Sequence, residues 1–208
     1  MSAYHFHLGD KASAQVLIER YHYSALMPPT SSIVGTWHAD GGLFGDSGEA
    51  VAACVIGSPA ARWGEPVMEL TRLVRAPECD APLSGLIAET VGWVKRKRVA
   101  DLVVSFADST QDHHGGIYQA CSWHYAGQRP SRMDGVIVGG RLLSGRAANH
   151  AFGTQSPDKL REMGIDATPH FCTGKHLYWR PMTKEGRRRA ERLGLGSVAY
   201  PKPAVVAA

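Results

Sequence analysis

No hydrophobic run in this 208-residue chain approaches the roughly 18 residues that a membrane-spanning helix requires. The amino terminus, Met-Ser-Ala-Tyr-His-Phe-His, also lacks the basic start and the apolar core of a secretory signal. Hydrophobic residues make up 44% and charged residues 20%, as in ordinary globular proteins. We therefore expect one domain in the cytoplasm, with no membrane as a partner.

Cysteine is also scarce, and its spacing excludes a familiar kind of metal site. The four cysteines, Cys54, Cys79, Cys121 and Cys172, are far apart and form no CxxC pair. This spacing argues against a structural zinc site and favours a reducing compartment. Cys54 and Cys121 lie in apolar stretches, where a cysteine behaves as a small core residue.

The excess of positive charge is small, with a net charge of +4 and an isoelectric point near 8.9. A net charge of this size does not by itself indicate binding to nucleic acid, so the positions of the basic residues are more informative than their total. The run Lys95–Arg98 either ends a helix in solvent, where cations suit the helix dipole, or binds phosphate. We expect the cluster Arg187, Arg188 and Arg189, followed by Lys202, to contact a phosphate backbone.

Hydrophobic periodicity predicts alternating strands and helices. Strands are expected at Ser32–His38, Glu49–Gly57, Val67–Arg75, Asp101–Ala107, Trp123–Gly127 and Lys175–Met182. Helices are expected at Lys11–Tyr21, Pro82–Lys97, Gly116–Ser122 and Thr183–Leu193. Gly135–Leu143 is either a strand or a hairpin arm, and Asn149–Pro169 is expected to be irregular with a helical piece at Pro157–Met163. The order is that of an α/β fold.

The segment from Val104 to Gly127 concentrates reactive side chains. A buried strand leads into Asp108, a loop with His113 and His114 follows, and a short helix then carries Tyr118. Ligands tend to bind at the carboxyl ends of strands in open α/β sheets, so a site is expected there. Alternatively, Asp108 is an ordinary turn residue and Tyr118 an ordinary core residue.

The order of elements, with the unit Val67–Lys97, resembles the GNAT acyltransferase fold, a mixed central sheet flanked by helices. The resemblance implies a single domain over 1–208, with a basic carboxy-terminal helix and tail at about 183–208. In that family the loop before the long helix binds the pyrophosphate of an acyl-coenzyme A. Here the loop carries Glu78 and Asp80, which repel pyrophosphate, so only Ser84, Gly85 and the helix N-terminus remain as anion binders.

Several motifs resemble the phage Mom family of DNA-modification proteins more closely. They cover most of residues 15–202: Tyr21-His-Tyr-Ser24, Glu69-Leu-Thr-Arg-Leu73, Leu83-Ser-Gly85, Phe106-Ala-Asp108, His113-His-Gly-Gly-Ile-Tyr118 and Tyr200-Pro-Lys202. The resemblance implies conversion of adenine N6 in duplex DNA to its carbamoylmethyl form, which protects phage DNA from host restriction. The partners would be double-stranded DNA and a small-molecule donor in the host cytoplasm, and a homodimer is left open.

The resemblance also implies roles for individual residues. Asp108 would act as general base on the weakly nucleophilic adenine N6, and Tyr118 would protonate the leaving group or position the donor. His22 and Tyr23 would border the base pocket, where the tyrosine ring stacks on a flipped adenine. Arg72 is a charge on the apolar-facing side of its predicted strand and needs a partner, for which Asp108 or a carboxylate of the donor are the candidates. With Ser84 and Gly85 it would hold the donor.

The cofactor is left open between an acyl-coenzyme A-like donor and iron. If iron binds, His22, Asp108, His113 and His114 supply candidate ligands for a set of two histidines and one carboxylate. Two other functions are weighed against DNA modification. One is a conventional acyl-coenzyme A-dependent N-acetyltransferase acting on a small amine or protein, and the other is a DNA-binding protein without enzymatic activity.

Overall fold

The computed structural model describes residues 4–40, 48–59, 63–64, 66–111 and 113–201. The chain divides into two compact units. Unit 1 comprises Met1–Phe106, Gly115–Gly127 and Leu177–Ala208, and unit 2 comprises Ala107–His114 and Gln128–His176. Each unit is described by itself, and the expectation of one domain stays a prediction.

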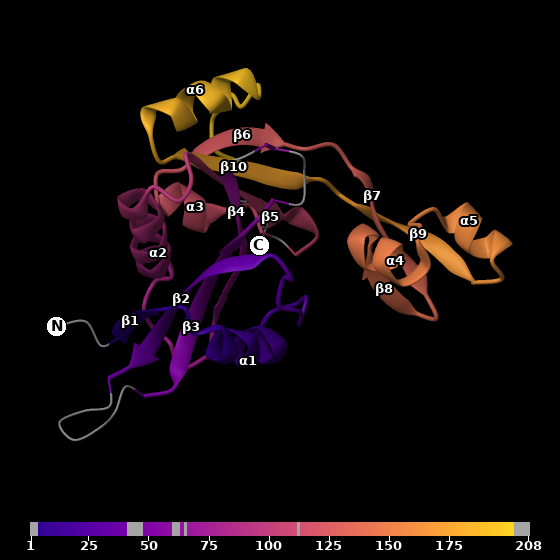
Figure 1. Ribbon diagram of the computed structural model, residues 1–208, viewed down its shortest axis with the longest axis horizontal. Helices are drawn as coiled ribbons and strands as arrows, with labels where there is room; N and C mark the ends of the chain where they lie inside the picture. Colours follow the sequence, from indigo (N-terminus) through magenta and orange to yellow (C-terminus); the bar gives the residue numbers. More distant parts are fainter. Residues whose placement is uncertain (1–3, 41–47, 60–62, 65, 112, 202–208) are drawn as a thin grey trace, which may run out of the picture. The chain divides into compact units, whose positions relative to one another are not determined.

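A seven-stranded sheet, in the order β1-β2-β3-β4-β5-β10-β6, forms the centre of unit 1 (Figure 1). Neighbours from β1 to β4 pair antiparallel, whereas β4 and β5 pair parallel. The prediction of a mixed central sheet is therefore confirmed. The strands are β1 (Tyr4–Leu8), β2 (Ser31–Ala39), β3 (Ala50–Gly57), β4 (Val67–Arg75), β5 (Leu102–Asp108), β6 (His124–Gln128) and β10 (Lys175–Pro181).

Two helices cover opposite faces of this sheet. α1 (Lys11–Tyr21) packs its buried side chains against a cluster that includes Val34 of β2. α2 (Ser84–Lys97) lies on the other face. A Cβ added to Gly35, the next residue of β2, would collide with Thr90 of α2, which shows that Gly35 faces this helix. Successive residues of a strand point to opposite faces, so neighbours in sequence contact different helices.

The crossover from β4 through α2 to β5 brings two parallel strands together. Their pairing covers Val67–Leu70 and Leu102–Ser105, although β4 continues to Arg75. The short helix α3 (Gly116–Ala120) and the basic helix α6 (Lys184–Arg192) complete unit 1. The predicted helices at Lys11–Tyr21, Pro82–Lys97 and Thr183–Leu193 are confirmed to within two residues at each end.

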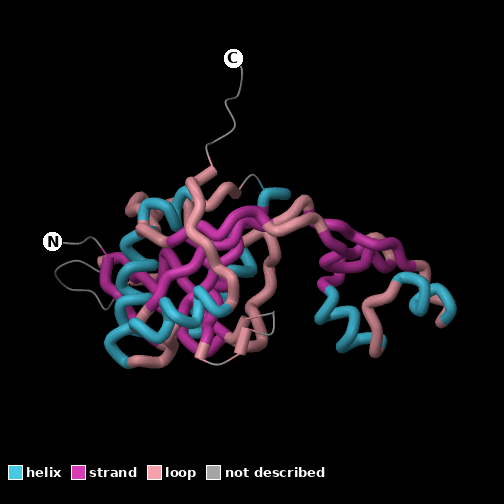
Figure 2. Tube along the Cα trace, turned by 90° about the horizontal axis from the view of Figure 1, so that it is seen from above, coloured by secondary structure: helices cyan, strands magenta, loops and turns pink. Residues whose placement is uncertain are grey.

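Unit 2 has its own sheet and core. Its strands β7 (Arg132–Val138), β8 (Arg141–Ser144) and β9 (Ala167–Cys172) pair antiparallel in the order β8-β7-β9. The helices α4 (Gly145–Phe152) and α5 (Pro157–Glu162) contribute Ala148 and Leu160 to a core with Val136 and Ala167. Figure 2 shows both helices on one side of the three strands. The single turn η2 (Ser109–Gln111) also belongs to this unit.

The β7–β8 connection resolves one alternative left open by the sequence. Gly139 and Gly140 both have positive φ, 56° and 77°, which is the conformation of a two-residue type I′ hairpin turn. The segment Gly135–Leu143 is therefore a hairpin rather than a single strand. The expectation that Asn149–Pro169 is irregular is wrong in part, since the segment contains the second half of α4 and the start of β9. The strand β1 was not predicted either.

All four cysteines are free thiols, and Cys54 is fully buried in β3 as a core residue. Trp37 and Trp179 are buried as well. Within the described residues, none of the helices has the length and apolarity needed to cross a membrane.

Candidate functional site

Tyr118 lies buried beneath the end of the β4–β5 pairing in unit 1. Its hydroxyl oxygen is 2.8 Å from Ser105 Oγ, and that Oγ is also 2.8 Å from the carbonyl oxygen of Leu70. Ser105 was not singled out from the sequence, where it is only a polar residue within an apolar strand. Burial raises the pKa of Tyr118 strongly, so its hydroxyl stays protonated at neutral pH.

The two contacts of Ser105 decide where the proton of Tyr118 points. A serine hydroxyl has one hydrogen, and a carbonyl oxygen can only accept. When Ser105 donates to the carbonyl of Leu70, the O–H of Tyr118 donates to Ser105. The resting state thus places the phenolic proton in a buried chain of two hydrogen bonds.

Gly115, in the motif before Tyr118, is required by packing. It is the N-cap of α3 with a φ of 81° in the left-handed region, which glycine adopts without strain. A Cβ there would lie 2.6 Å from Cζ of Tyr178 and closer still to its Cε2. Tyr178 cannot yield, because it is fully buried and its ring packs 5.1 Å from that of Tyr118.

Arg72 lies in β4, two residues beyond Leu70, and is half-buried. Its Nε donates to the carbonyl of Leu26 at 3.1 Å, and its Nη1 donates to the carbonyl of Thr71 at 2.7 Å. These carbonyls supply the polar partner that the sequence required. Burial lowers the pKa of Arg72, while Tyr23 and Glu69 act in the opposite direction. A guanidinium has five N–H donors, so two carbonyls do not exhaust its capacity to bind a ligand.

His22 and Tyr23 follow α1, with His22 as its C-cap. The backbone N–H of Ser24 donates to Nδ1 of His22 at 3.1 Å, and the hydroxyl of Ser24 lies 2.9 Å from the same nitrogen. Nδ1 is therefore an acceptor, which places the ring hydrogen of a neutral His22 on Nε2. The two rings stack with centroids 4.4 Å apart, and Tyr23 is 56% exposed, so an aromatic surface faces solvent.

Ser84 and Gly85 open α2, and their surroundings differ. The N-cap Leu83 offers no side-chain acceptor to the first turn of the helix. The carbonyl of Ser84 accepts a hydrogen bond from the thiol of Cys121 at 3.7 Å. A Cβ on Gly85 would lie 2.9 Å from Cη2 of Trp37, so this glycine also makes room for an indole ring.

Asp108 ends β5 and lies in unit 2. Its Oδ1 accepts from the backbone N–H of Thr110 at 3.0 Å and from the hydroxyl of that residue at 2.5 Å. Its Oδ2 lies 3.1 Å from Nζ of Lys175. Burial alone would raise the pKa of Asp108, but the contacts with Thr110 and Lys175 outweigh it, so the pKa is lowered. The carboxyl group is thus ionised at neutral pH.

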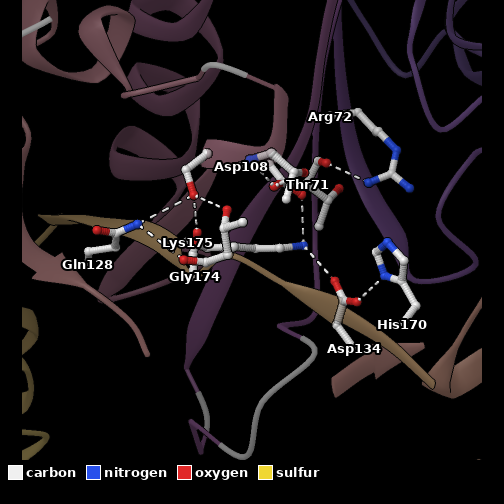
Figure 3. A network of polar contacts seen from close by, with 11 residues as sticks. Thr71, Arg72, Asp108, Gln128, Asp134, His170, Gly174 and Lys175 are labelled. Atoms are coloured by element: carbon white, nitrogen blue, oxygen red, sulfur yellow. Dashed lines mark hydrogen bonds and ion pairs between the residues drawn. The ribbon is translucent and has the colours of Figure 1, made fainter. Parts of the chain in front are cut away.

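Lys175 extends this contact into a network in unit 2 (Figure 3). Its Nζ also lies 3.6 Å from Oδ2 of Asp134, and Oδ1 of Asp134 lies 2.8 Å from Nδ1 of His170. None of Lys175, Asp134 and His170 was singled out from the sequence. Its only signal was the position of Lys175 directly after Gly174, at the start of a predicted strand.

Asp108 and Tyr118 belong to different units, so their meeting in one pocket stays a prediction. His113 and His114 follow Asp108 in unit 2, and the backbone N–H of His113 donates to the carbonyl of Asp108 at 3.2 Å. No group of three or more His, Cys, Asp or Glu side chains that could hold a metal ion is found among the residues the structure describes.

The basic cluster of α6 is exposed at Arg187 and Arg188. Two arginines of the helix form ion pairs with Glu185. Nη1 of Arg188 lies 3.7 Å from its Oε2, and Nη2 of Arg192 lies 2.7 Å from its Oε1. Arg189 is half-buried, and its Nε has no hydrogen-bond partner among the described atoms. Contact of Arg187 and Arg188 with phosphate stays a prediction, and Lys202 lies outside the described residues.

Comparison with known protein families and solved structures gives evidence that is independent of this geometry. The model of the Mom protein family matches residues 3–202. No curated protein matches the chain.

Among solved structures, spermidine N-acetyltransferase from Vibrio cholerae, in complex with coenzyme A and spermine, aligns with a TM-score of 0.50 at 7% identity. The alignment covers 88% of this chain and 98% of that one. A chain of the NatC complex bound to Gag peptide and coenzyme A gives 0.50 at 9% identity, covering 88% and 100%. The ribosomal-protein-S18-alanine N-acetyltransferase of Escherichia coli gives 0.48 at 8%, covering 86% and 95%. The fold is that of GNAT acetyltransferases, as predicted.

Proposed function

This chain belongs to the Mom protein family, and we propose that it is a transferase acting on adenine N6 in double-stranded DNA. The product expected from the family resemblance is the carbamoylmethyl form, which protects DNA from restriction. The family match over residues 3–202 carries the proposal. The ionised carboxylate of Asp108 supports it chemically.

The adenine N6 lone pair is delocalised into the ring, so the amine attacks well only if its proton is removed as the new bond forms. Asp108 accepts that proton while N6 forms a bond to the donor carbon, and the leaving group departs with the electron pair of its broken bond. A carboxylate has about four lone-pair sites, and three donors from Thr110 and Lys175 occupy Asp108. One acceptor site is left by these contacts for the substrate proton.

The other candidate residues bind the two substrates. The exposed ring of Tyr23 stacks on an adenine flipped from the duplex, with His22 beside it. Arg72 and Ser84 hold the donor, and the buried hydroxyl of Tyr118 positions it or protonates its leaving group. Arg187 and Arg188 bind phosphate, which adds affinity but no sequence preference.

Nucleoside mass spectrometry of plasmid DNA co-expressed with the chain tests the proposal. We expect modified deoxyadenosine with the wild-type chain and none with Asp108→Asn. Asp166→Asn, which changes an exposed aspartate elsewhere in unit 2, is the matched control and should leave modification unchanged. Only unmodified deoxyadenosine from a folded wild-type chain would refute the proposal.

A conventional N-acetyltransferase is the second candidate, because solved structures with this fold include acetyltransferases with bound coenzyme A. This candidate predicts tight binding of acetyl-coenzyme A. The acidic side chains of Glu78 and Asp80 before α2 oppose a pyrophosphate at that place, so we expect weak binding. Calorimetry with acetyl-coenzyme A separates the two functions.

A further inference from the structure

The polar network of unit 2 contains more charged groups than a simple ion pair needs. Lys175 lies between two carboxylates, 3.1 Å from Asp108 and 3.6 Å from Asp134. Asp134 uses its other oxygen for His170, 2.8 Å away. The four side chains come from the strands β5, β10, β7 and β9, and Figure 3 shows them in one continuous row.

The backbone around these residues holds the row in place. A register shift between Met133 and Gly135 places Asp134 at a β-bulge of the β7–β9 pair. Bulges redirect side chains and are common next to active sites. Ser109, directly after Asp108, lies 2.9 Å from Thr173 Oγ1 and also hydrogen-bonds the carbonyl of Gly174. These contacts tie the end of β5 to the start of β10, so Asp108 and Lys175 face each other in a fixed geometry.

We propose that Lys175 is a positioning residue that holds the carboxylate of Asp108 for proton transfer, and that Asp134 and His170 hold Lys175. The inference rests on the proposed function, in which Asp108 is the base. A lysine ammonium on a flexible four-carbon stem does not fix a partner's orientation by itself. The second carboxylate restricts the stem, and the hydrogen bond from His170 in turn fixes that carboxylate.

The charges of the network affect the titration of Asp108. The groups that face Asp108 are the Thr110 hydroxyl and backbone N–H, the Lys175 ammonium and, beyond it, the Asp134 carboxylate with His170. The positive charge of Lys175 favours the ionised form of Asp108, whereas the negative charge of Asp134 opposes it. Changing Lys175 and changing Asp134 should therefore move the titration of Asp108 in opposite directions.

The experiment measures two quantities on the full-length chain. One is the titration of the Asp108 carboxyl carbon by NMR, assigned with Asp108→Asn, and the other is the pH dependence of the DNA modification rate. Lys175→Gln should move the Asp108 titration and the acidic limb of the rate profile to higher pH, and Asp134→Asn should move both to lower pH. Lys159→Gln, at an exposed lysine of α5, is the control and should move neither.

A conservative variant separates position from charge. Lys175→Arg keeps the positive charge but not the shape of the ammonium, so the acidic limb should stay in place. The rate on the high-pH plateau should fall on the order of 10–100-fold, as a displacement of about 1 Å in a reacting group can cause. A full plateau rate with Lys175→Arg overturns positioning, and unchanged titration with Lys175→Gln overturns the coupling itself.

Failure of the proposed function has a different signature. If the folded wild-type chain leaves deoxyadenosine unmodified, the transferase proposal fails, and with it the catalytic role of Lys175. The NMR titration then still decides whether Lys175 and Asp134 act on Asp108 in opposite directions, because it requires neither DNA nor a donor.

Discussion

Replacing Gly115 by alanine tests whether the glycine before α3 is required by packing. Two effects act at this position. The φ of 81° lies in the left-handed region, and an added Cβ would lie 2.6 Å from Cζ of Tyr178, well inside van der Waals contact. Tyr178 is fully buried between the rings of Tyr118 and Tyr125, at 5.1 and 5.0 Å, so it has no room to withdraw.

The expected loss of stability is the sum of the backbone strain and the steric collision. A residue with a Cβ in the left-handed conformation costs about 1–2 kcal/mol. An extra methyl group in a packed core costs about 1–3 kcal/mol more. We therefore expect Gly115→Ala to lower the free energy of unfolding by about 2–5 kcal/mol.

Gly194→Ala is the matched control, because Gly194 has a φ of 66° but no atom within 4 Å of the added Cβ. It should lose only the conformational part, about 1–2 kcal/mol. Urea unfolding followed by tryptophan fluorescence measures both variants. Equal losses for the two glycines would refute the argument, since the collision with Tyr178 would then contribute nothing.

Three further predictions concern the candidate site. Tyr118→Phe should change the free energy of unfolding by less than about 1 kcal/mol, whereas Ser105→Ala should cost about 1–3 kcal/mol because it leaves a buried phenol without a partner; urea unfolding compares them. Because the pKa of Asp108 is lowered in the folded state, its ionised form stabilises the fold above the unfolded-state pKa, and this stabilisation disappears as pH falls through the lowered value. Asp108→Asn should accordingly lose less stability than wild type between about pH 5 and pH 2, measured by urea unfolding at each pH. Changing Arg187 and Arg188 together to alanine should reduce the slope of log binding constant against log salt by about 1.8 in a DNA titration, and an unchanged slope would exclude both from phosphate contact.

Most of the fold could be predicted because its elements carry clear periodicity. The α1 helix has an aspartate cap and apolar residues on one face, and its predicted bounds match the structure. The elements that were missed have weak local signals. The strand β9 contains Pro169, which argues against a strand, yet β9 lies at the edge of its sheet, where proline is tolerated. The helix α4 has only eight residues, too few to be stable in isolation, so its packing in unit 2 stabilises it.

The candidate site could be predicted only where its residues are close in sequence. Asp108 and Tyr118 lie ten residues apart in the segment Val104–Gly127, and both were predicted as site residues from the sequence. Lys175 and Asp134 lie near Asp108 because strands that are distant in sequence pair with one another, and no local sequence pattern predicts such a contact. Ser105 was missed for a different reason: a serine in an apolar strand is common, and only its contact with the buried phenol distinguishes it.

Residues that carry a family resemblance need not all take part in chemistry, and Gly85 illustrates the distinction. Its added Cβ would lie 2.9 Å from Cη2 of Trp37, whose Nε1 is anchored by a hydrogen bond to Glu89. Loss of activity in Gly85→Ala would therefore follow from displacing the indole as readily as from losing a donor contact. The neighbouring Ser84→Ala is the sharper test, because it keeps a Cβ and removes only a hydroxyl. A rise in the KM for the donor with unchanged unfolding assigns this helix N-terminus to donor binding, and an unchanged KM removes Ser84 from the site.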